Sequence, residues 1–367
     1  MTSESRHEPV PGIVSPSLRG WLECVVERGA SDLLLVADAP PALKINGAVS
    51  PLADAAKLTS ADIAAAVAPA LPEHARRLFA DAGIADGSLH LPELGRFRIN
   101  LHHERGRVAA AIRRLPQTVP SFGSLNLPPA VESLTHLRRG LVLVGGQTGS
   151  GKTTTLAALV NAINISEPRH IVTIEDPIEY EHAHHASLVE QVEIGVDAPD
   201  FPTALRAALR QAPDVLVVGE MCDPETMRIA LAAAETGHLV FSTVHTTDVA
   251  STISRVADSF PAERQNTIRQ ELSMSLAAVL TQTLLPKKGG GRVAAAELLF
   301  VSYGARQHIR KNALQHLHQE IAITRKQGSI TLEESLSRLA RDGVVDLEDA
   351  RARAAHPEEF ENYLRGA

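Results

Sequence analysis

A glycine-rich stretch between an apolar run and a helix-like segment constrains the fold of this chain more than any other feature. Residues 141–144 read Leu-Val-Leu-Val, which indicates a buried strand, and residues 146–153 follow as GQTGSGKT. Glycines let the backbone fold tightly, so that consecutive N–H groups face a bound polyphosphate. The Ala- and Leu-rich segment after the loop predicts a helix whose N-terminus points at the same anion. The sequence therefore predicts a phosphate-binding loop.

The residues of this loop have separate expected roles. We expect Lys152 to reach the β- and γ-phosphates of a nucleotide, and the hydroxyl of Thr153 to ligate Mg²⁺. A glycine-rich turn without a ligand is the alternative, and the strand before the loop and the helix after it argue against that alternative. The predicted nucleotide-binding residues are Gly146, Gln147, Thr148, Gly149, Ser150, Gly151, Lys152, Thr153 and Thr154.

The composition limits the class of protein. The 367 residues are 44% hydrophobic, which suits a folded chain of two or three domains. A formal net charge of −7 disfavours a general nucleic-acid-binding surface, which is normally basic. Two cysteines, Cys24 and Cys222, are too few for a disulfide framework or a four-cysteine zinc site. No apolar run approaches the roughly 18 residues of a membrane span, and the polar start lacks a signal peptide's apolar region, so we expect a cytoplasmic protein.

The first third of the chain predicts a small α+β domain. Residues 1–16 are rich in Ser, Pro and charge, and we expect them to form a flexible tail. Residues 17–115 then show helix and strand patterns, with one hairpin expected at Asn46-Gly47. A second hairpin is expected at Arg105-Gly106, because apolar and polar residues alternate on both sides of that turn.

The remainder predicts an α/β domain. Residues 116–129 hold four prolines and are interpreted as a linker. Residues 130–367 begin with alternating strands and helices, which predicts a parallel sheet with helices on both faces. A string of short helices is expected from about residue 304. The predicted strands include residues 141–144, 170–174, 214–219, 239–244 and 292–300.

Carboxylates follow two of the predicted strands. Glu220 ends the apolar strand 214–219, where an acid would lie beside Mg²⁺ and its waters. Glu175, Asp176 and Glu179 lie within five residues, and such clustering is costly without nearby cations. One of these three carboxylates is expected to orient or deprotonate an attacking water. A solvated acidic turn is the alternative.

Two histidines flank the strand 239–244. His238 precedes it and His245 follows it, so both are expected at sheet edges. An imidazole there could hydrogen-bond a γ-phosphate or a catalytic carboxylate. Core or surface histidines are the alternative.

Taken together, these motifs resemble those of the secretion-type hexameric ATPases, and most closely the PilT-type retraction ATPases of type IV pili. The resemblance runs from Ser31 almost to the C-terminus and has several specific segments in the family's order. Besides the phosphate loop, these are residues 31–49 (SDLLLVADAPPALKINGAV), 95–100 (GRFRIN), 173–179 (TIEDPIE), 218–221 (VGEM), 233–248 (AAETGHLVFSTVHTTD) and 304–311 (GARQHIRK).

The resemblance implies a fold and an assembly. The fold would be α/β, a RecA-like P-loop ATPase core with a smaller α+β, PAS-like N-terminal domain and a helical C-terminal tail. Six copies would form a ring, with ATP and Mg²⁺ bound between the N-terminal and ATPase domains. Arginines would reach this site from a neighbour or from the N-terminal domain, and Arg96, Arg98, Arg113 and Arg114 are the candidates.

The resemblance also implies a role for each site residue. Glu179 would be the catalytic glutamate that positions or activates water, and Glu220 the Walker B acid that acts on Mg²⁺ and its waters, beside Lys152. His238 and His245 would sense the γ-phosphate and couple it to domain movement. Such a motor would power pilin disassembly and twitching motility. Its partner would be a platform protein at the cytoplasmic face of the inner membrane, and a paralogous retraction ATPase could share the work.

The chain departs from the family pattern at two places. Cys222 stands where the family usually has an arginine after the Walker B Glu-Met, which bears on activity and cooperativity. In residues 304–311, which are similar to the motif linked to retraction, Gln307, His308 and Lys311 replace more typical residues. This second departure bears on the direction of pilus movement.

Three alternatives stay open on the sequence alone. An accessory, PilU-like ring subunit would bind ATP and hydrolyse it weakly, which Cys222 favours and the intact Lys152, Glu179 and Glu220 disfavour. A pilus assembly or type II secretion ATPase commonly carries a four-cysteine zinc module, which this chain lacks the cysteines to build. A nucleic-acid motor is disfavoured by the acidic charge and scarce aromatic residues, so no nucleic-acid partner is expected.

Overall fold

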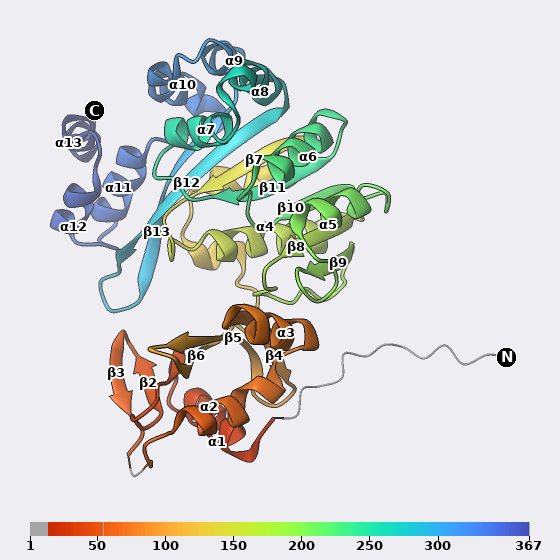
Figure 1. The fold of residues 1–367 in the computed structure, drawn as a ribbon. Helices are drawn as coiled ribbons and strands as arrows, with labels where there is room; N and C mark the ends of the chain where they lie inside the picture. Colours follow the sequence, from red (N-terminus) through yellow and green to blue (C-terminus); the bar gives the residue numbers. More distant parts are fainter. Residues whose placement is uncertain (1–13, 54, 367) are drawn as a thin grey trace. The chain divides into compact units, whose positions relative to one another are not determined.

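The chain forms two compact units (Figure 1). The computed structural model describes residues 14–53 and 55–366. The first unit contains residues 14–118 and 195–197, and the second contains residues 119–194 and 198–366. Most of the predicted flexible tail lies outside the described residues.

The first unit is built on an antiparallel sheet. Its six described strands follow the order β3-β2-β1-β6-β5-β4. The strands are β1 (Asp32–Leu35), β2 (Ala42–Ile45), β3 (Ala48–Pro51), β4 (Ile84–Leu91), β5 (Gly95–Glu104) and β6 (Arg107–Arg114). The helices are α1 (Pro16–Glu27), α2 (Ser60–Val67), the 3₁₀ helix η1 (Ala68–Ala70) and α3 (Glu73–Ala82).

Turn chemistry positions the hairpins of this sheet. Asn46 and Gly47 both have positive φ, 50° and 85°, which the β2–β3 hairpin requires. Arg105 and Gly106 turn the β5–β6 hairpin in the same way, with φ of 49° and 75°. Both predicted hairpins are therefore confirmed. The apolar residues of β5 are buried in the core of the first unit.

The second unit is built on a mostly parallel sheet. Its seven described strands follow the order β13-β12-β7-β11-β10-β8-β9, and only the edge strand β13 runs antiparallel to its neighbour. The strands are β7 (Gly140–Gly145), β8 (His170–Glu175), β9 (Leu188–Glu193), β10 (Val215–Val218), β11 (Leu239–Val244), β12 (Leu276–Pro286) and β13 (Arg292–Phe300).

Helices accompany this sheet throughout the second unit. The α-helices are α4 (Lys152–Ser166), α5 (Phe201–Ala208), α6 (Pro224–Glu235), α7 (Val249–Asp258), α8 (Ala262–Ser275), α9 (Tyr303–Arg310), α10 (Leu317–Ile323), α11 (Leu332–Arg341), α12 (Leu347–Arg353) and α13 (Pro357–Arg365). The 3₁₀ helices are η2 (Phe122–Leu125), η3 (Pro129–His136), η4 (Leu314–His316) and η5 (Thr324–Gln327). In this list η2 and the start of η3 lie in residues 116–129, where the sequence predicted little regular structure.

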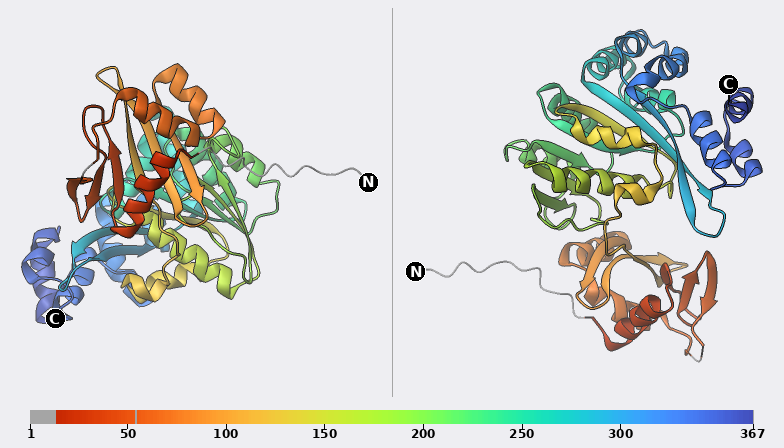
Figure 2. Two further views of the ribbon diagram at one scale, coloured as in Figure 1. Left: turned by 90° about the horizontal axis from the view of Figure 1, so that it is seen from below. Right: turned by 180° about the vertical axis from the view of Figure 1, so that it is seen from behind.

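Helices cover both faces of the sheet (Figure 1 and Figure 2). Leu141 and Leu143 of β7 pack into the core that α6, α7 and α8 contribute to. Val142 and Val144 point the opposite way and pack with the apolar residues of α4. Since a strand alternates its side chains, burial on both faces explains why β7 reads as a continuous apolar run.

The sequence analysis missed β12, the strand that lies beside β7. It begins at Leu276, directly after the last residue of α8, with no turn residue between the two elements. Its residues are buried on both faces over most of its length, so the alternating pattern of a half-buried strand is absent. The missed strand matters because it contributes Gln282 to the phosphate loop, as described below.

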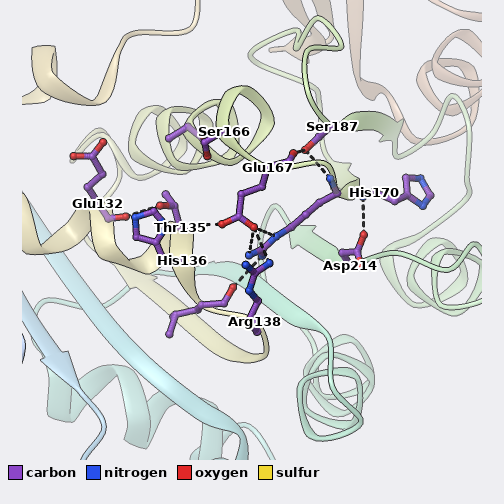
Figure 3. Close-up of polar contacts among 12 residues, drawn as sticks. Glu132, Thr135, His136, Arg138, Ser166, Glu167, His170, Ser187 and Asp214 are labelled. Carbon is purple, nitrogen blue, oxygen red and sulfur yellow. Dashed lines mark hydrogen bonds and ion pairs between the residues drawn. The ribbon is translucent and has the colours of Figure 1, made fainter.

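A polar cluster ties the amino-terminal edge of this sheet together (Figure 3). The Arg169 side chain is 5% exposed and pairs with Glu167 at 2.6 Å, and it also donates to the carbonyl oxygen of Leu137 at 2.9 Å. Arg138 adds an exposed ion pair to the same carboxylate at 2.8 Å. Burial raises the pKa of Glu167, but the hydrogen bond and charge of Arg169 outweigh it and lower that pKa below its usual value. The cluster joins the segment before β7 to the end of α4 and the start of β8.

We predict that this pair stabilises the second unit. Glu167→Gln should lower the free energy of unfolding by about 3 kcal/mol, because it leaves the buried Arg169 charge uncompensated. Arg138→Ala is the matched control and should cost less than about 1 kcal/mol, since its side chain is 76% exposed. Urea unfolding of both variants measures the difference, and equal losses would contradict the prediction.

The stabilisation that Glu167 contributes depends on pH. A carboxylate with a lowered folded pKa stabilises the protein above its unfolded pKa, and this stabilisation is lost as the pH falls through the folded value. The gap between wild type and Glu167→Gln should therefore be widest near neutral pH and narrow in acid.

Candidate active site

Four parallel strands end at one edge of the second unit's sheet and place the predicted site residues there. β7, β11, β10 and β8 are neighbours in this order and run in the same direction (Figure 1). The loops that follow them carry Lys152, His245, Glu220 and Glu179. Ligands of open parallel sheets bind outside these carboxyl ends.

The loop between β7 and α4 is shaped by glycines. A Cβ on Gly146 would meet Ser150 Oγ at 2.2 Å and the carbonyl oxygen of Gln282 at 2.9 Å, so no larger residue fits there. Gly151 caps α4 with a φ of 89°, a conformation that side chains disfavour. The loop therefore turns tightly into the N-terminus of a helix of 15 residues, which favours an anion.

Lys152 is buried inside this loop. Its side chain folds back, and Nζ donates to the carbonyl oxygens of Gly146 at 2.7 Å and Gln147 at 3.1 Å. Burial lowers the pKa of Lys152, while the negative charges of Glu220 and Glu179 oppose that change. Both carboxylates therefore lie close enough to act on the ammonium group, which brings three of the predicted residues together.

His245 connects Lys152 to Glu220. Its Nδ1 lies 3.4 Å from Lys152 Nζ, and its Nε2 lies 3.3 Å from Glu220 Oε1. An ammonium group only donates, so Nδ1 is the acceptor of this pair, and Nε2 is the ring nitrogen that faces the carboxylate. The imidazole is partly exposed, with 44% of its side-chain surface accessible. This position allows it to respond to a group that binds at the loop.

The structure separates the three carboxylates of the acidic turn. Glu175 accepts hydrogen bonds from Thr173 Oγ1 at 2.7 Å and Gln191 Nε2 at 3.1 Å, and burial raises the pKa of Glu175. It therefore holds the turn in place. Asp176 acts on the thiol of Cys222, as described below, whereas Glu179 acts on Lys152.

The structure does not bring His238 to this edge. His238 precedes β11, and its carbonyl oxygen bonds the N–H of Gly140 at the start of β7. Its ring binds the carbonyl oxygen of Ala233 at 3.0 Å. The six residues of β11 span roughly 20 Å, so His238 and His245 lie at opposite edges of the sheet. Within one chain, His238 is too far from the loop to contact a phosphate held there.

The loop and its surroundings fit a polyphosphate and a cation. Ser150 Oγ is buried and, among the described residues, has no hydrogen-bond partner. Lys152 supplies a charge, and the hydroxyl of Thr153 at the start of α4 is partly accessible. Thr154 is instead bonded to Tyr180 OH at 3.0 Å, which links α4 to the acidic turn.

The chain matches the family described as type II/IV secretion system protein over residues 124–352. It is also 41% identical to the type IV pilus retraction ATPase PilT of Pseudomonas aeruginosa, over 91% of this chain and 97% of that protein. The chain belongs to the PilT-type secretion ATPases.

Two further comparisons agree with this membership. The type IV pilus ATPase PilU of Pseudomonas aeruginosa is 37% identical over 91% of this chain and 87% of its own length. A crystal structure of the pilus retraction motor PilT with bound ADP is 44% identical, covers 93% of this chain and 98% of that chain, and has a TM-score of 0.83. The described residues contain no helix with the length and apolar character needed to cross a membrane.

Cys222 occupies an acidic corner of this PilT-type site. Partial burial of the thiol in this otherwise exposed residue, a hydrogen bond to Glu220 and the charges of Glu220, Asp223 and Asp176 raise the pKa of Cys222 to about 12. The thiol is therefore neutral at physiological pH. A cation would be favoured among these carboxylates, which gives a physical reason for the arginine that the family usually has here.

Gln282 is a site residue that the sequence analysis missed. From β12, its Nε2 donates to the carbonyl oxygen of Ser150 at 2.7 Å, and its Oε1 accepts from Thr155 Oγ1 at 2.9 Å. It thereby clamps the phosphate loop to the first turn of α4. The available signal was a buried amide in an otherwise apolar run, which predicts a specific polar partner.

We predict that Lys152→Ala weakens ADP binding by about 10- to 100-fold or more, because it removes a charge-assisted contact to phosphate. Isothermal titration calorimetry measures the change. Lys287→Ala, an exposed lysine after β12, is the control and should bind ADP like wild type. An unchanged affinity in Lys152→Ala would contradict the assignment of the phosphate loop.

Proposed function

We propose that this protein is a motor that hydrolyses ATP to power type IV pilus retraction, and thereby twitching motility. The observation that carries the proposal is the contact of His245 with both Lys152 and Glu220, in a chain that matches PilT along nearly its full length. This arrangement links the group that holds phosphate to the acid beside it. A motor driven by ATP needs such a link to couple the state of the nucleotide to the positions of other residues.

The residues of the site divide the reaction between them. Lys152 and the N–H groups of the loop, residues 146–154, hold and orient the β- and γ-phosphates. Glu179 accepts a hydrogen bond from the attacking water and takes its proton as the water adds to the γ-phosphorus. The bond from that phosphorus to the β–γ bridging oxygen breaks, and ADP leaves. Thr153 and Glu220, the latter partly through water, would hold Mg²⁺, which neutralises charge on the phosphates when it is bound.

His245 is proposed as the sensor of the γ-phosphate. Its contacts with Lys152 and Glu220 depend on where those two side chains lie, so loss of phosphate would alter both contacts. The loop that carries it leads into α7, and a shift of His245 is therefore passed to that helix. His238 has no proposed role in the chemistry of its own chain.

The proposed assembly is a homo-hexamer whose neighbours complete each site. Arg98 pairs with Asp86 at 3.3 Å and Arg113 with Asp32 at 2.8 Å. Both arginines are partly exposed, and such ion pairs are worth less than about 1 kcal/mol. Turning Arg98 and Arg113 toward a neighbour's phosphates would therefore cost little, and Arg96 and Arg114 are the other proposed candidates.

The proposed partner is a platform protein at the cytoplasmic face of the inner membrane. The ring would act on it from the cytoplasm, alone or with a paralogous retraction ATPase. Neither nucleic acid nor direct insertion into lipid is part of the proposal.

We predict that Glu179→Gln retains ATP binding but lowers turnover at least about 100-fold, because the group that accepts the proton is lost. Phosphate release is measured with Mg²⁺ at protein concentrations where a ring forms. Glu181→Gln, an exposed acid in the same segment, is the control and should turn over like wild type. Equal turnover in Glu179→Gln would move the role to another carboxylate.

The second candidate function is the accessory, PilU-like ring subunit. Cys222 favours it, because a neutral thiol supplies no positive charge beside Glu220, Asp223 and Asp176. Under this alternative the wild type would bind ATP tightly, form a ring and hydrolyse ATP weakly. Cys222→Arg would then raise turnover. Expression of this protein in a host that lacks its own PilT is a second test, because restored twitching would distinguish a retraction motor from both accessory and assembly ATPases.

A further inference from the structure

Glu297 is a buried carboxyl group that the reaction described above does not use. It lies on β13, is 8% exposed, and stands between apolar residues of that strand. Placing a carboxylate in such surroundings is costly unless specific donors meet it. The donors therefore indicate what this residue does.

Both donors that bond Glu297 lead to the active-site loop. Its Oε2 accepts from the backbone N–H of Val249 at 2.9 Å and from Thr281 Oγ1 at 3.2 Å. Val249 is the first residue of α7, whose N-cap is Asp248. Glu297 thus satisfies one of the N–H groups that a helix leaves unbonded at its start, and it fixes where α7 begins.

The segment before α7 is packed against the phosphate loop. Thr246 Oγ1 bonds Thr252 Oγ1 at 2.6 Å, within the same segment. A Cβ on Gly145, the residue before the loop, would meet Thr246 at 2.7 Å, Thr281 at 2.8 Å and Thr252 at 2.9 Å. The hydroxyl groups of Thr246 and Thr252 and the methyl group of Thr281 therefore form the wall behind this glycine.

We propose that Glu297 is a positioning residue, which holds residues 245–249 against the phosphate loop so that His245 stays between Lys152 and Glu220. The segment is anchored at one end by β11, which ends at Val244, and at the other by the bond of Glu297 to Val249. Only four residues lie between these anchors, so a release at Val249 moves His245. This inference rests on the proposed ATPase reaction for its kinetic consequence.

The surroundings of Glu297 bring the ionisation of its carboxyl group close to neutral pH. Burial and the charges of Asp248 and Glu333 raise the pKa of Glu297, whereas the bonds from Val249 and Thr281 lower it. The resulting pKa is about 7. A cavity of about 250 Å³ adjoins the group and is also lined by Arg353 and His356. The ionised form is the stronger acceptor for an N–H group. The hold on the loop is therefore tightest above pH 7 and weakens as the pH falls below it.

The test compares Glu297→Ala with Glu297→Gln. An amide oxygen can accept both bonds made by Oε2, whereas alanine removes them. We expect Glu297→Ala to lower kcat about 100-fold while the KM for ATP changes less than about twofold, as a misplaced catalytic group would. Glu297→Gln should keep kcat within about threefold of wild type and lose the rise in kcat between pH 6 and 8 that titration of the acid adds.

Glu333→Gln is the matched control. Glu333 is a buried carboxyl of the same cavity, but it accepts from the N–H of His356 at 2.8 Å and, within the described part of the chain, makes no hydrogen bond to the loop. The kcat of Glu333→Gln should equal that of wild type. A loss in Glu333→Gln as large as in Glu297→Ala would overturn the proposal, because it would mean that any change in this cavity has the same effect.

Hydrogen–deuterium exchange gives a readout that does not depend on turnover. In Glu297→Ala the peptide that covers residues 245–252 should exchange faster than in wild type. Glu297→Gln should stay closer to wild type than to the alanine variant, and Glu333→Gln should not differ from wild type. Unchanged exchange in Glu297→Ala, or faster exchange with an unchanged kcat, would overturn the positioning role. A wild type that exchanges as expected but hydrolyses no ATP would instead count against the proposed function.

Discussion

The parallel pairing of β7, β11, β10 and β8 is the constraint on which the rest of the site depends. Because these strands run in one direction, their carboxyl ends lie at one edge, and the loops that follow them meet there. Residues separated by nearly seventy positions, Glu179 and His245 among them, are thereby brought to the same lysine. His238 and His245 flank β11, so the length of this strand separates them, and only His245 lies at the carboxyl ends.

The two edges of the sheet handle buried charge in different ways. At the amino-terminal edge, Arg169 and Glu167 neutralise each other at 2.6 Å and tie the chain together. At the carboxyl edge, Lys152 is desolvated and bonded to carbonyl oxygens, with Glu220 and Glu179 near enough to oppose the fall of its pKa. The first arrangement neutralises its own charge. In the second arrangement, the Lys152 ammonium group and the buried Ser150 hydroxyl can still bind a phosphate.

Support for the catalytic edge comes from residues behind it. Gln282 holds the phosphate loop to α4, and Glu297 holds the segment of His245 to β13. Both belong to the β12–β13 hairpin, which lies on the side of β7 away from the acids. A hairpin outside the family's named motifs thus supplies polar contacts that position residues within those motifs.

The sequence by itself determined the phosphate loop, both hairpins of the first unit, the alternation of the second and the family, because each depends on local backbone chemistry or on a contiguous motif. Gly146 and Asn46-Gly47 are examples, since their conformations follow from residue type. Only the tertiary structure decided that Glu175 supports the turn while Glu179 faces Lys152, and that Gln282 and Glu297 contribute. These properties depend on strand order and on burial on both faces of a sheet, which pair residues far apart in the chain and leave no periodic signal in it.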